Sequence, residues 1–332
     1  MGKAAVLGAG AWGTALAKVL ADKGNEVAVW AHRPELAEQI QRDRVNARYL
    51  PNATLPPTLR ATADLEEALG GAELVVVVIP SHALRGTVRE ARRYLPTGAL
   101  ICSATKGIEN DSLMLMSETL VDELGPEVEP RLTYLSGPSF AKEVAAGQPT
   151  AVVVAGQSEA ETHAVQRSFA TDRLRVYSSS DVVGVEIGGA LKNVVAIAAG
   201  AADGLGFGHN ARAGLITRGL AEIARVAMVK GANPLTLAGL SGMGDLVLTC
   251  TGELSRNRTV GFEMGRGRTL EDVLATLGHV AEGVKTAKSA YELGQKLNVE
   301  MPITCEVYRA LYEGKSPRQA VVDLMNRALT RE

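Results

Sequence analysis

Short apolar runs alternate with helix-like patterns over the first half of the chain. The clearest run is Leu-Val-Val-Val-Val-Ile at residues 74–79, which is continuous rather than alternating. A continuous run of this kind is typical of a parallel strand that is covered on both faces. Further strands are expected at residues 4–7, 26–30, 99–102, 132–135 and 151–154, with helices at residues 11–22 and 34–46. This rhythm predicts an α/β fold with a Rossmann-like, doubly wound sheet.

The pattern changes near residue 181. Beyond the serines at 178–180 no stretch predicts a strand convincingly, and Asp181 is a suitable N-cap for a long helix that reaches Ala202. Further helices are expected at residues 210–230, 257–265, 269–277, 283–297, 303–313 and 317–327. We therefore expect two domains: a dinucleotide-binding domain over residues 1–180, and an all-helical, substrate-binding domain over residues 181–332.

Composition narrows the class of protein. The chain has 332 residues, of which 46% are hydrophobic and 22% charged, as is ordinary for a soluble globular protein. A net charge of -2 gives no global field that would draw the protein to nucleic acid or to anionic membranes, and an aromatic content of only 4% argues against base-stacking platforms. The three cysteines are far apart and form no metal or redox spacing, and no histidine–carboxylate spacing predicts a metal site. The start of the chain is a poor signal peptide, so we expect a cytoplasmic protein.

A glycine pattern follows the first expected strand. Gly8, Gly10 and Gly13 form a G-x-G-x-x-G turn that leads into the helix expected at residues 11–22. In such a turn the first glycine permits a tight bend, the second lets the backbone approach a pyrophosphate, and the third allows close helix packing. The helix N-terminus adds free N–H groups and a positive dipole end. We interpret the turn as a dinucleotide-binding site and prefer this to a chance glycine-rich turn.

The end of the second expected strand bears on the choice of coenzyme. NAD-selective folds usually place an acidic residue there to hold the ribose 2′-hydroxyl. This chain has His32 and Arg33 instead. Arg33 could face the 2′-phosphate of NADP, or it could be a solvated side chain at a strand end. We predict that NADP(H) is accepted at least as well as NAD(H).

Lys192 is the leading candidate for chemistry. It lies in Gly-Ala-Leu-Lys-Asn-Val-Val-Ala at residues 189–196, an apolar stretch of the long helix, where a cation is costly unless it has a task. Oxidation of a secondary alcohol needs a base for the hydroxyl proton, and reduction needs the same group as an acid. An ordinary lysine has a pKa of about 10.4, and lowering that pKa by roughly three units costs about 4 kcal/mol. The alternative is a lysine that only extends its amine to the surface.

Four further polar clusters accompany the glycine turn. Two follow expected strands, at residues 105–107 and 136–140, and two belong to the helical half, at Lys192-Asn193 and at residues 242–245 with 255–257. Open α/β sheets bind ligands at the carboxyl ends of their strands. We therefore expect a cleft between the two domains.

With these residues collected, the chain resembles the NAD(P)-dependent glycerol-3-phosphate dehydrogenases of the bacterial type over nearly its whole length. The most specific pieces are Gly-Ala-Leu-Lys-Asn-Val at 189–194, Ala-Thr-Lys-Gly-Ile-Glu at 104–109, Leu-Ser-Gly-Pro-Ser-Phe-Ala at 135–141 and Asn-Ala-Arg-Ala-Gly-Leu-Ile-Thr-Arg-Gly at 210–219. The resemblance implies interconversion of sn-glycerol 3-phosphate and dihydroxyacetone phosphate with NADP(H) or NAD(H), supply of the former for phospholipid synthesis, and a homodimer. It also implies a C-terminal domain like that of 6-phosphogluconate dehydrogenase.

The resemblance further implies roles for individual positions. Lys192 would be the proton acceptor, with Lys106 and Asp245 completing the catalytic set. The substrate would contact Lys106, Gly137, Ser139, Lys192, Asp245, Ser255, Arg256 and Asn257. To the glycine turn and His32 the family adds these coenzyme contacts: Trp12, Arg33, Lys106, Ala141, Arg256, Val280 and Glu282. Family members commonly have serine where this chain has Ala11, so only backbone contact is expected at that position.

For several of these residues a purely structural role stays open, and so do other functions for the protein. A carboxylate beside Lys192 would raise the pKa of its amine, so we assign Asp245 to orientation rather than to proton transfer. Arg256 and the amide of Asn257 suit a phosphate, although Asp245 and Ser255 could equally be helix caps. Lys106 could be a solvated loop lysine, and His209 is expected to be structural or exposed. The competing functions are a β-hydroxyacid or 6-phosphogluconate dehydrogenase and a non-catalytic dinucleotide sensor.

Overall fold

The computed structural model describes residues 2–277 and 281–329. It divides into two compact units. The first comprises the chain up to Lys106 and Met116–Val185, and the second comprises Gly107–Leu115 and the chain from Glu186 onward. The division thus falls within a helix, five residues after the boundary expected from the sequence, and the segment before Met116 joins the second unit.

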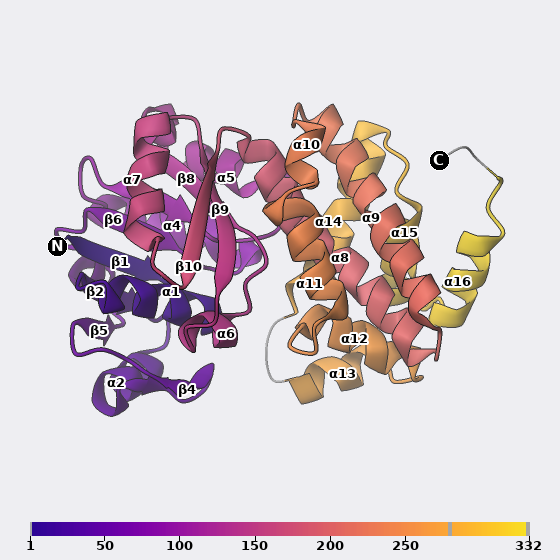
Figure 1. Cartoon of the computed structure of the whole chain (residues 1–332), viewed down its shortest axis with the longest axis horizontal. Coiled ribbons are helices and arrows are strands. Elements are labelled where there is room, and N and C mark those ends of the chain that lie inside the picture. The colour runs from indigo at the N-terminus through magenta and orange to yellow at the C-terminus, as the bar shows by residue number, and fades with distance from the viewer. Residues whose placement is uncertain (1, 278–280, 330–332) are drawn as a thin grey trace. The chain divides into compact units, whose positions relative to one another are not determined.

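The first unit is built on one mixed sheet (Figure 1). In spatial order its strands are β10 (Leu174–Ser179), β9 (Thr150–Gly156), β8 (Leu132–Ser136), β7 (Leu100–Ser103), β6 (Leu74–Val77), β1 (Lys3–Leu7), β2 (Glu26–Trp30) and β5 (Leu59–Thr62). Neighbouring strands are parallel except β8 and β9, which are antiparallel. The predicted Rossmann-like sheet is confirmed. Strand β1 lies between its parallel neighbours β6 and β2, so the loop after β1 begins at the carboxyl edge of these strands.

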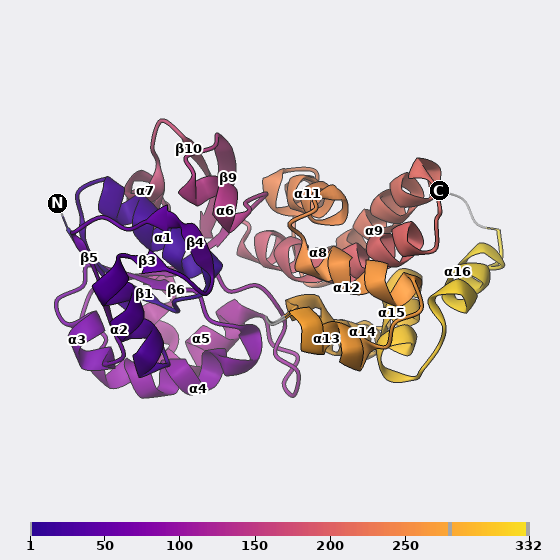
Figure 2. The same cartoon turned by 90° about the horizontal axis from the view of Figure 1, so that it is seen from below.

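Helices cover both faces of this sheet (Figure 2). One face carries α3 (Leu65–Leu69), α4 (Ser81–Ala91) and α5 (Met116–Leu124), and the other carries α1 (Ala11–Asp22), α6 (Ala141–Ala145) and α7 (Glu159–Phe169). Along β6, Val76 packs into the core of one face, while Val75 and Val77 pack into the core of the other. This two-sided burial explains why the strand is apolar at every position.

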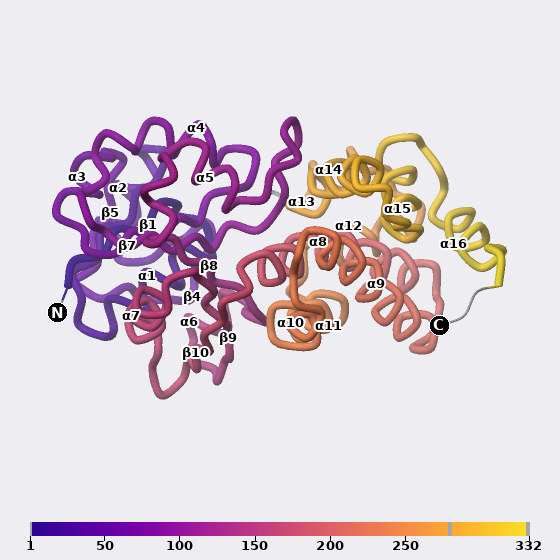
Figure 3. Tube along the Cα trace, turned by 90° about the horizontal axis from the view of Figure 1, so that it is seen from above, coloured from indigo at the N-terminus to yellow at the C-terminus, as the bar shows by residue number. Residues whose placement is uncertain are grey.

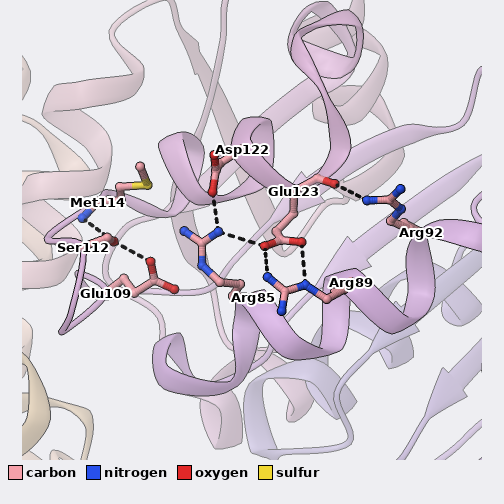
Figure 4. A network of polar contacts seen from close by, with 8 residues as sticks. All are labelled: Arg85, Arg89, Arg92, Glu109, Ser112, Met114, Asp122 and Glu123. Carbon is pink, nitrogen blue, oxygen red and sulfur yellow. Dashed lines mark hydrogen bonds and ion pairs between the residues drawn. The ribbon is translucent and has the colours of Figure 1, made fainter.

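Shorter elements complete the first unit. Helix α2 (Pro34–Asp43) packs against β5, and β3 (Val45–Asn46) pairs with β4 (Leu50–Thr54) in a small antiparallel ladder. Short 3-10 turns lie at Arg92–Tyr94 and Pro126–Arg131. On one face, Glu123 of α5 accepts hydrogen bonds from Arg85 and Arg89 of α4 (Figure 4). The two helices are therefore joined by an ion-pair network, which also includes Asp122.

From Glu186 onward, the described part of the second unit is helical (Figure 3). Its helices are α8 (Val182–Gly204), α9 (His209–Val229), α10 (Pro234–Leu237), α11 (Asp245–Thr251), α12 (Arg256–Gly265), α13 (Leu270–Leu277), α14 (Glu282–Leu297), α15 (Pro302–Tyr312) and α16 (Pro317–Met325). A π-helical turn at Leu240–Gly244 leads into α11. As predicted, Asp181 caps α8, its Oδ1 accepting a hydrogen bond of 2.9 Å from Gly184 N.

Helix α8 is a core helix. Among the described residues it alone has the length and apolar composition of a membrane span, with a mean hydropathy of 1.6, yet 83% of that stretch is buried within the fold. It packs against α12 through glycines on both helices, so the two backbones touch. A Cβ atom at Gly200 would overlap the carbonyl oxygen of Arg258, and one at Gly261 would overlap that of Ile197. The separation of these two helices is therefore fixed by backbone contact.

The same pair of helices is also tied by charge. Asp203 of α8 accepts hydrogen bonds through Oδ2 from Arg258 of α12 (3.0 and 2.7 Å) and through Oδ1 from Arg212 of α9 (2.9 and 2.7 Å). The carboxylate side chain is 6% exposed. One buried carboxylate thus joins three helices.

The element boundaries expected from the sequence need some correction. The helix expected at 34–46 ends at Asp43, because Arg44 adopts a left-handed conformation with a φ of 55°. Strands β3, β4, β5 and β10 and helices α10 and α11 were not predicted. Strand β10 alternates buried and exposed residues at the edge of the sheet, and its serine-rich end disguised it as a loop.

Candidate active site

The glycine turn in the first unit is shaped by backbone contacts. Gly8 has a φ of +122°, and a Cβ there would overlap the carbonyl oxygen of Val78. A Cβ at Gly13 would overlap the carbonyl oxygen of Gly8 itself. At Gly10, by contrast, an added Cβ would meet nothing within 4 Å. Two glycines are thus required by packing, while the middle one leaves open space.

That open space lies at the start of α1. Gly10 is the N-cap of the helix and no side chain caps it, so the first turn offers its backbone N–H groups as the glycine motif requires. Ala11, at the first helical position, contributes backbone only. Among the described residues, the indole Nε1 of Trp12 is buried without a hydrogen-bond partner. A cradle for an anion and a buried donor that awaits an acceptor both fit a dinucleotide.

Other predicted coenzyme contacts lie nearby in this unit. Trp12 packs with Ala141, the first residue of α6, around Ala15 and Leu50. His32 and Arg33 follow β2 and are exposed. The guanidinium of Arg33 is nevertheless held, since its Nη2 donates to the hydroxyl of Tyr49 at 2.7 Å.

The two predicted substrate loops of the first unit begin at neighbouring strands, β7 and β8. Lys106 is half-buried and follows Thr105, whose hydroxyl accepts a hydrogen bond of 3.1 Å from Ile79 N. Gly137 follows β8 with a φ of +130°, and Ser139 Oγ donates to its carbonyl at 2.9 Å. Both loops are therefore shaped at the carboxyl edge of the sheet, as predicted for a ligand-binding edge.

Lys192 heads the group of polar residues in the second unit. It lies on α8 and is 7% exposed. Its amine donates to Asp245 Oδ1 and, at 2.9 Å, to Thr249 Oγ1. Thr249 in turn donates to the carbonyl oxygen of Asp245 at 2.6 Å. The three side chains form a buried, mutually oriented cluster, in which the carboxylate stabilises the ammonium form of the lysine.

Thr249 was missed by the sequence reasoning. Asp245 and Thr249 are four residues apart, which places them on one face of α11. The signal was present in the spacing, but glycines at 242 and 244 made the stretch resemble a loop. The four-residue spacing indicates a shared face only if the stretch is known to be a helix.

The predicted phosphate-binding residues begin α12. Ser255 is its N-cap, with its hydroxyl accepting from Arg258 N at 3.2 Å, and the exposed Arg256 is the first helical residue. Asn257 donates to Asn193 Oδ1 at 2.9 Å and accepts from Gly283 N at 2.9 Å. The capping alternative for Ser255 thus holds, and the amide of Asn257 ties α8, α12 and the start of α14 together.

The remaining predictions concern α14, the thiols and metals. Glu282 is the first residue of α14 and is half-buried, whereas Val280 lies outside the described residues.

Burial raises the pKa of Cys102 and of Cys250 to about 12, so both thiols stay protonated near neutral pH. In the described ranges no three His, Cys, Asp or Glu side chains gather as a metal site. The structure thus brings together Lys192, Asp245 and Thr249 in one unit and the glycine turn, Trp12 and Ala141 in the other.

Both halves of the chain match the same family of known proteins. Residues 3–162 match the family model described as NAD-dependent glycerol-3-phosphate dehydrogenase N-terminus, and residues 181–322 match the corresponding C-terminus model. A glycerol-3-phosphate dehydrogenase [NAD(P)+] of Anaeromyxobacter dehalogenans is 57% identical over 98% of both chains. That of Citrifermentans bemidjiense is 55% identical over 99% of this chain and 98% of its own. The crystal structure of glycerol-3-phosphate dehydrogenase from Coxiella burnetii has a TM-score of 0.94 at 41% identity, covering 98% and 99% of the two chains.

Proposed function

The chain belongs to the NAD-dependent glycerol-3-phosphate dehydrogenase family, and we propose that Lys192 is the residue that moves the proton in this reaction. The activity itself, NAD(P)-dependent oxidoreduction of glycerol 3-phosphate, follows from the curated relatives. Among the reactions considered above, these relatives favour that of glycerol 3-phosphate over those of β-hydroxyacids and 6-phosphogluconate. The observation that carries the proposal is that the buried amine of Lys192 donates hydrogen bonds to Asp245 and Thr249.

The surroundings of Lys192 support proton donation to a ketone. When bound, the coenzyme supplies or accepts the hydride. Asp245 and Thr249 favour the protonated amine and aim it, while burial favours the neutral amine after the proton has left. These opposing effects suit a group that must act as an acid in reduction and as a base in oxidation. Asp245 is then an orienting residue that keeps its own negative charge.

The start of α12 supports a site for the substrate phosphate. Arg256 is exposed at the first helical position, where its charge adds to the positive end of a ten-residue helix. Ser255 and Asn257 hold this terminus in place. The contacts we propose for them are the hydroxyl of Ser255 and the backbone N–H of Asn257, because the backbone N–H of Ser255 already donates to the carbonyl oxygen of Gly252. Replacing Arg256 by Ala is expected to raise KM for dihydroxyacetone phosphate more than it lowers kcat. An equal loss with an unphosphorylated analogue would contradict this role.

We extend the proposal to the other predicted positions and to the protein in its cell. The first unit binds the dinucleotide through its glycine turn, Trp12, Arg33 and Ala141, and the second unit supplies Lys192 and the phosphate site. Lys106, Gly137, Ser139 and Glu282 complete the proposed contacts. The enzyme is a cytoplasmic homodimer without stable membrane insertion. It works mainly in reduction, which supplies glycerol 3-phosphate to phospholipid synthesis, and it accepts NADPH at least as well as NADH.

The test separates chemistry from coenzyme binding. Lys192→Ala is expected to lower kcat for NADPH-dependent reduction of dihydroxyacetone phosphate by at least about a thousandfold, within the range of general acid–base catalysis. The Kd for NADPH, measured by fluorescence titration, should change little. Lys288→Ala, which removes an exposed lysine of α14, is the matched control and should leave kcat unchanged. If Lys192→Ala keeps its turnover, the proposal is wrong.

A further inference from the structure

The segment between α2 and β4 connects two parts of the coenzyme site. Asn46 is completely buried, and its Nδ2 donates to the carbonyl oxygen of Ala9 at 2.9 Å and to Thr14 Oγ1 at 2.8 Å. Ala9 belongs to the glycine turn and Thr14 to the helix that follows it. Asn46 Oδ1 in turn accepts from Tyr49 N at 3.2 Å. The buried amide of Asn46 therefore links the glycine turn to the backbone of Tyr49.

The other side of Tyr49 is fixed as well. The next residue, Leu50, is 2% exposed and lies in the apolar cluster with Ala15 and Trp12. Tyr49 is thus held between a buried amide contact and a buried leucine. A side chain with only two rotatable bonds loses little freedom when its backbone is fixed in this way.

Two arginine side chains contact the side chain of Tyr49. Arg33 Nη2 donates to its hydroxyl at 2.7 Å, and the guanidinium of Arg48 lies 5.5 Å from the centre of its ring. Arg33 is exposed, so without this bond its long side chain would sample many rotamers. The phenol hydroxyl instead holds the guanidinium at the end of β2, where the adenosine ribose lies in folds of this class.

We propose that Tyr49 determines coenzyme preference by holding Arg33 in position for the 2′-phosphate of NADP(H). This inference rests on the proposed function of Arg33. A guanidinium that is already in position loses less side-chain entropy when it pairs with a phosphate, and one such side chain is worth about a threefold to tenfold change in affinity. NAD(H) has a 2′-hydroxyl in place of the phosphate, so it gains nothing comparable. Tyr49 is a positioning residue, and Arg33 is the residue that contacts the ligand.

The experiment is a double-mutant cycle on Arg33 and Tyr49. KM and kcat for NADPH and for NADH are measured with the full-length wild type, Tyr49→Phe, Arg33→Ala and the double variant. Tyr49→Phe keeps the ring beneath Arg48 and removes only the hydroxyl. We expect it to raise KM for NADPH about threefold to tenfold, with kcat and the NADH constants nearly unchanged. In the Arg33→Ala background the same change should have no further effect.

Tyr177→Phe is the matched control. Tyr177 also carries an arginine over its ring, with Arg175 at 5.4 Å from the centroid, and is 49% exposed on β10. It should leave both coenzymes unaffected. If Arg33→Ala is selective for NADPH but Tyr49→Phe is not, the positioning role is overturned while the role of Arg33 stands. If Arg33→Ala does not change the NADPH-to-NADH ratio, both are overturned.

Discussion

The glycine turn of the first unit and the Lys192 cluster of the second unit are built from different chemical groups. In the first unit the glycine turn uses backbone alone: two glycines are forced by packing, and the third leaves space at a helix N-terminus. In the second unit Lys192 and Asp245 put opposite charges side by side in the interior. A backbone site costs nothing in buried charge, whereas a side-chain site is stable only while its charges balance. The same kind of substitution should therefore act differently in the two units.

The largest effect on stability is expected in the second unit. Asp245→Ala leaves the amine of Lys192 buried without its carboxylate, and the free energy of unfolding should fall by about 3–5 kcal/mol. Replacing the pair together, with Lys192→Met and Asp245→Leu, should restore most of that stability but no activity. Urea unfolding followed by circular dichroism measures both. A single variant that unfolds like the wild type would show that the pair is not a buried charge pair.

Next in size is a contrast within the glycine turn. Gly13→Ala drives a methyl group into the carbonyl oxygen of Gly8, so the variant should lose about 1–3 kcal/mol and bind NADPH poorly. Gly10→Ala meets no atom within 4 Å, so its melting temperature should stay close to that of the wild type. Its affinity for NADPH should still fall, because the methyl group enters the space we assign to the pyrophosphate. Equal affinity in Gly10→Ala and the wild type would remove the pyrophosphate from this turn.

The smallest effects concern pH and have opposite signs in the two units. Hydrogen bonds from Arg89 hold the pKa of Glu123 below its usual value, although burial opposes this (Figure 4). In the second unit burial raises the pKa of Glu222, a residue of α9 whose carboxylate accepts from the backbone N–H groups of Ile303 and Thr304 at the start of α15.

The signs follow from proton binding. Glu123 stabilises the fold fully above its unfolded pKa of about 4.3, and this contribution is lost as the pH falls through its lower folded pKa. Glu222 binds its proton more tightly when folded, so its contribution improves as the pH falls from 7 towards 4.3 and worsens as the pH rises. Urea unfolding of Glu123→Gln should show its stability difference from the wild type shrinking as the pH falls below about 4.3. Between pH 7 and about 4.3, acidification should instead make the wild type more stable relative to Glu222→Gln.

The sequence predicted the parts of the fold whose residues obey one simple period. Helix α1 and strand β2 have the boundaries expected for them, because an apolar stripe or run and a terminal glycine or proline mark them. The helix after β2 was extended too far, since the buried bonds of Asn46 to the glycine turn are non-local and leave no periodic trace. For the same reason Tyr49 was not suspected of holding Arg33.

The candidate site divides along the same line. Gly8, Gly10 and Gly13 could be assigned because a backbone motif is written in consecutive residues. The partner of Lys192 was foreseen only as a possible contact, because Asp245 lies 53 positions away and meets it through the packing of α11 on α8. Thr249 required knowledge of α11, which the π-helical turn before it concealed.

The glycine contact between α8 and α12 limits how this enzyme could be altered. Arg256 and Lys192 lie on helices whose backbones touch at Gly200 and Gly261, where no larger residue fits. Within the second unit, these backbone contacts therefore fix the distance from the amine of Lys192 to the start of α12, where we propose that the substrate phosphate binds. Accepting a longer substrate would require rebuilding the loops that lead into these helices, since widening the gap between them would break their interlocking backbones.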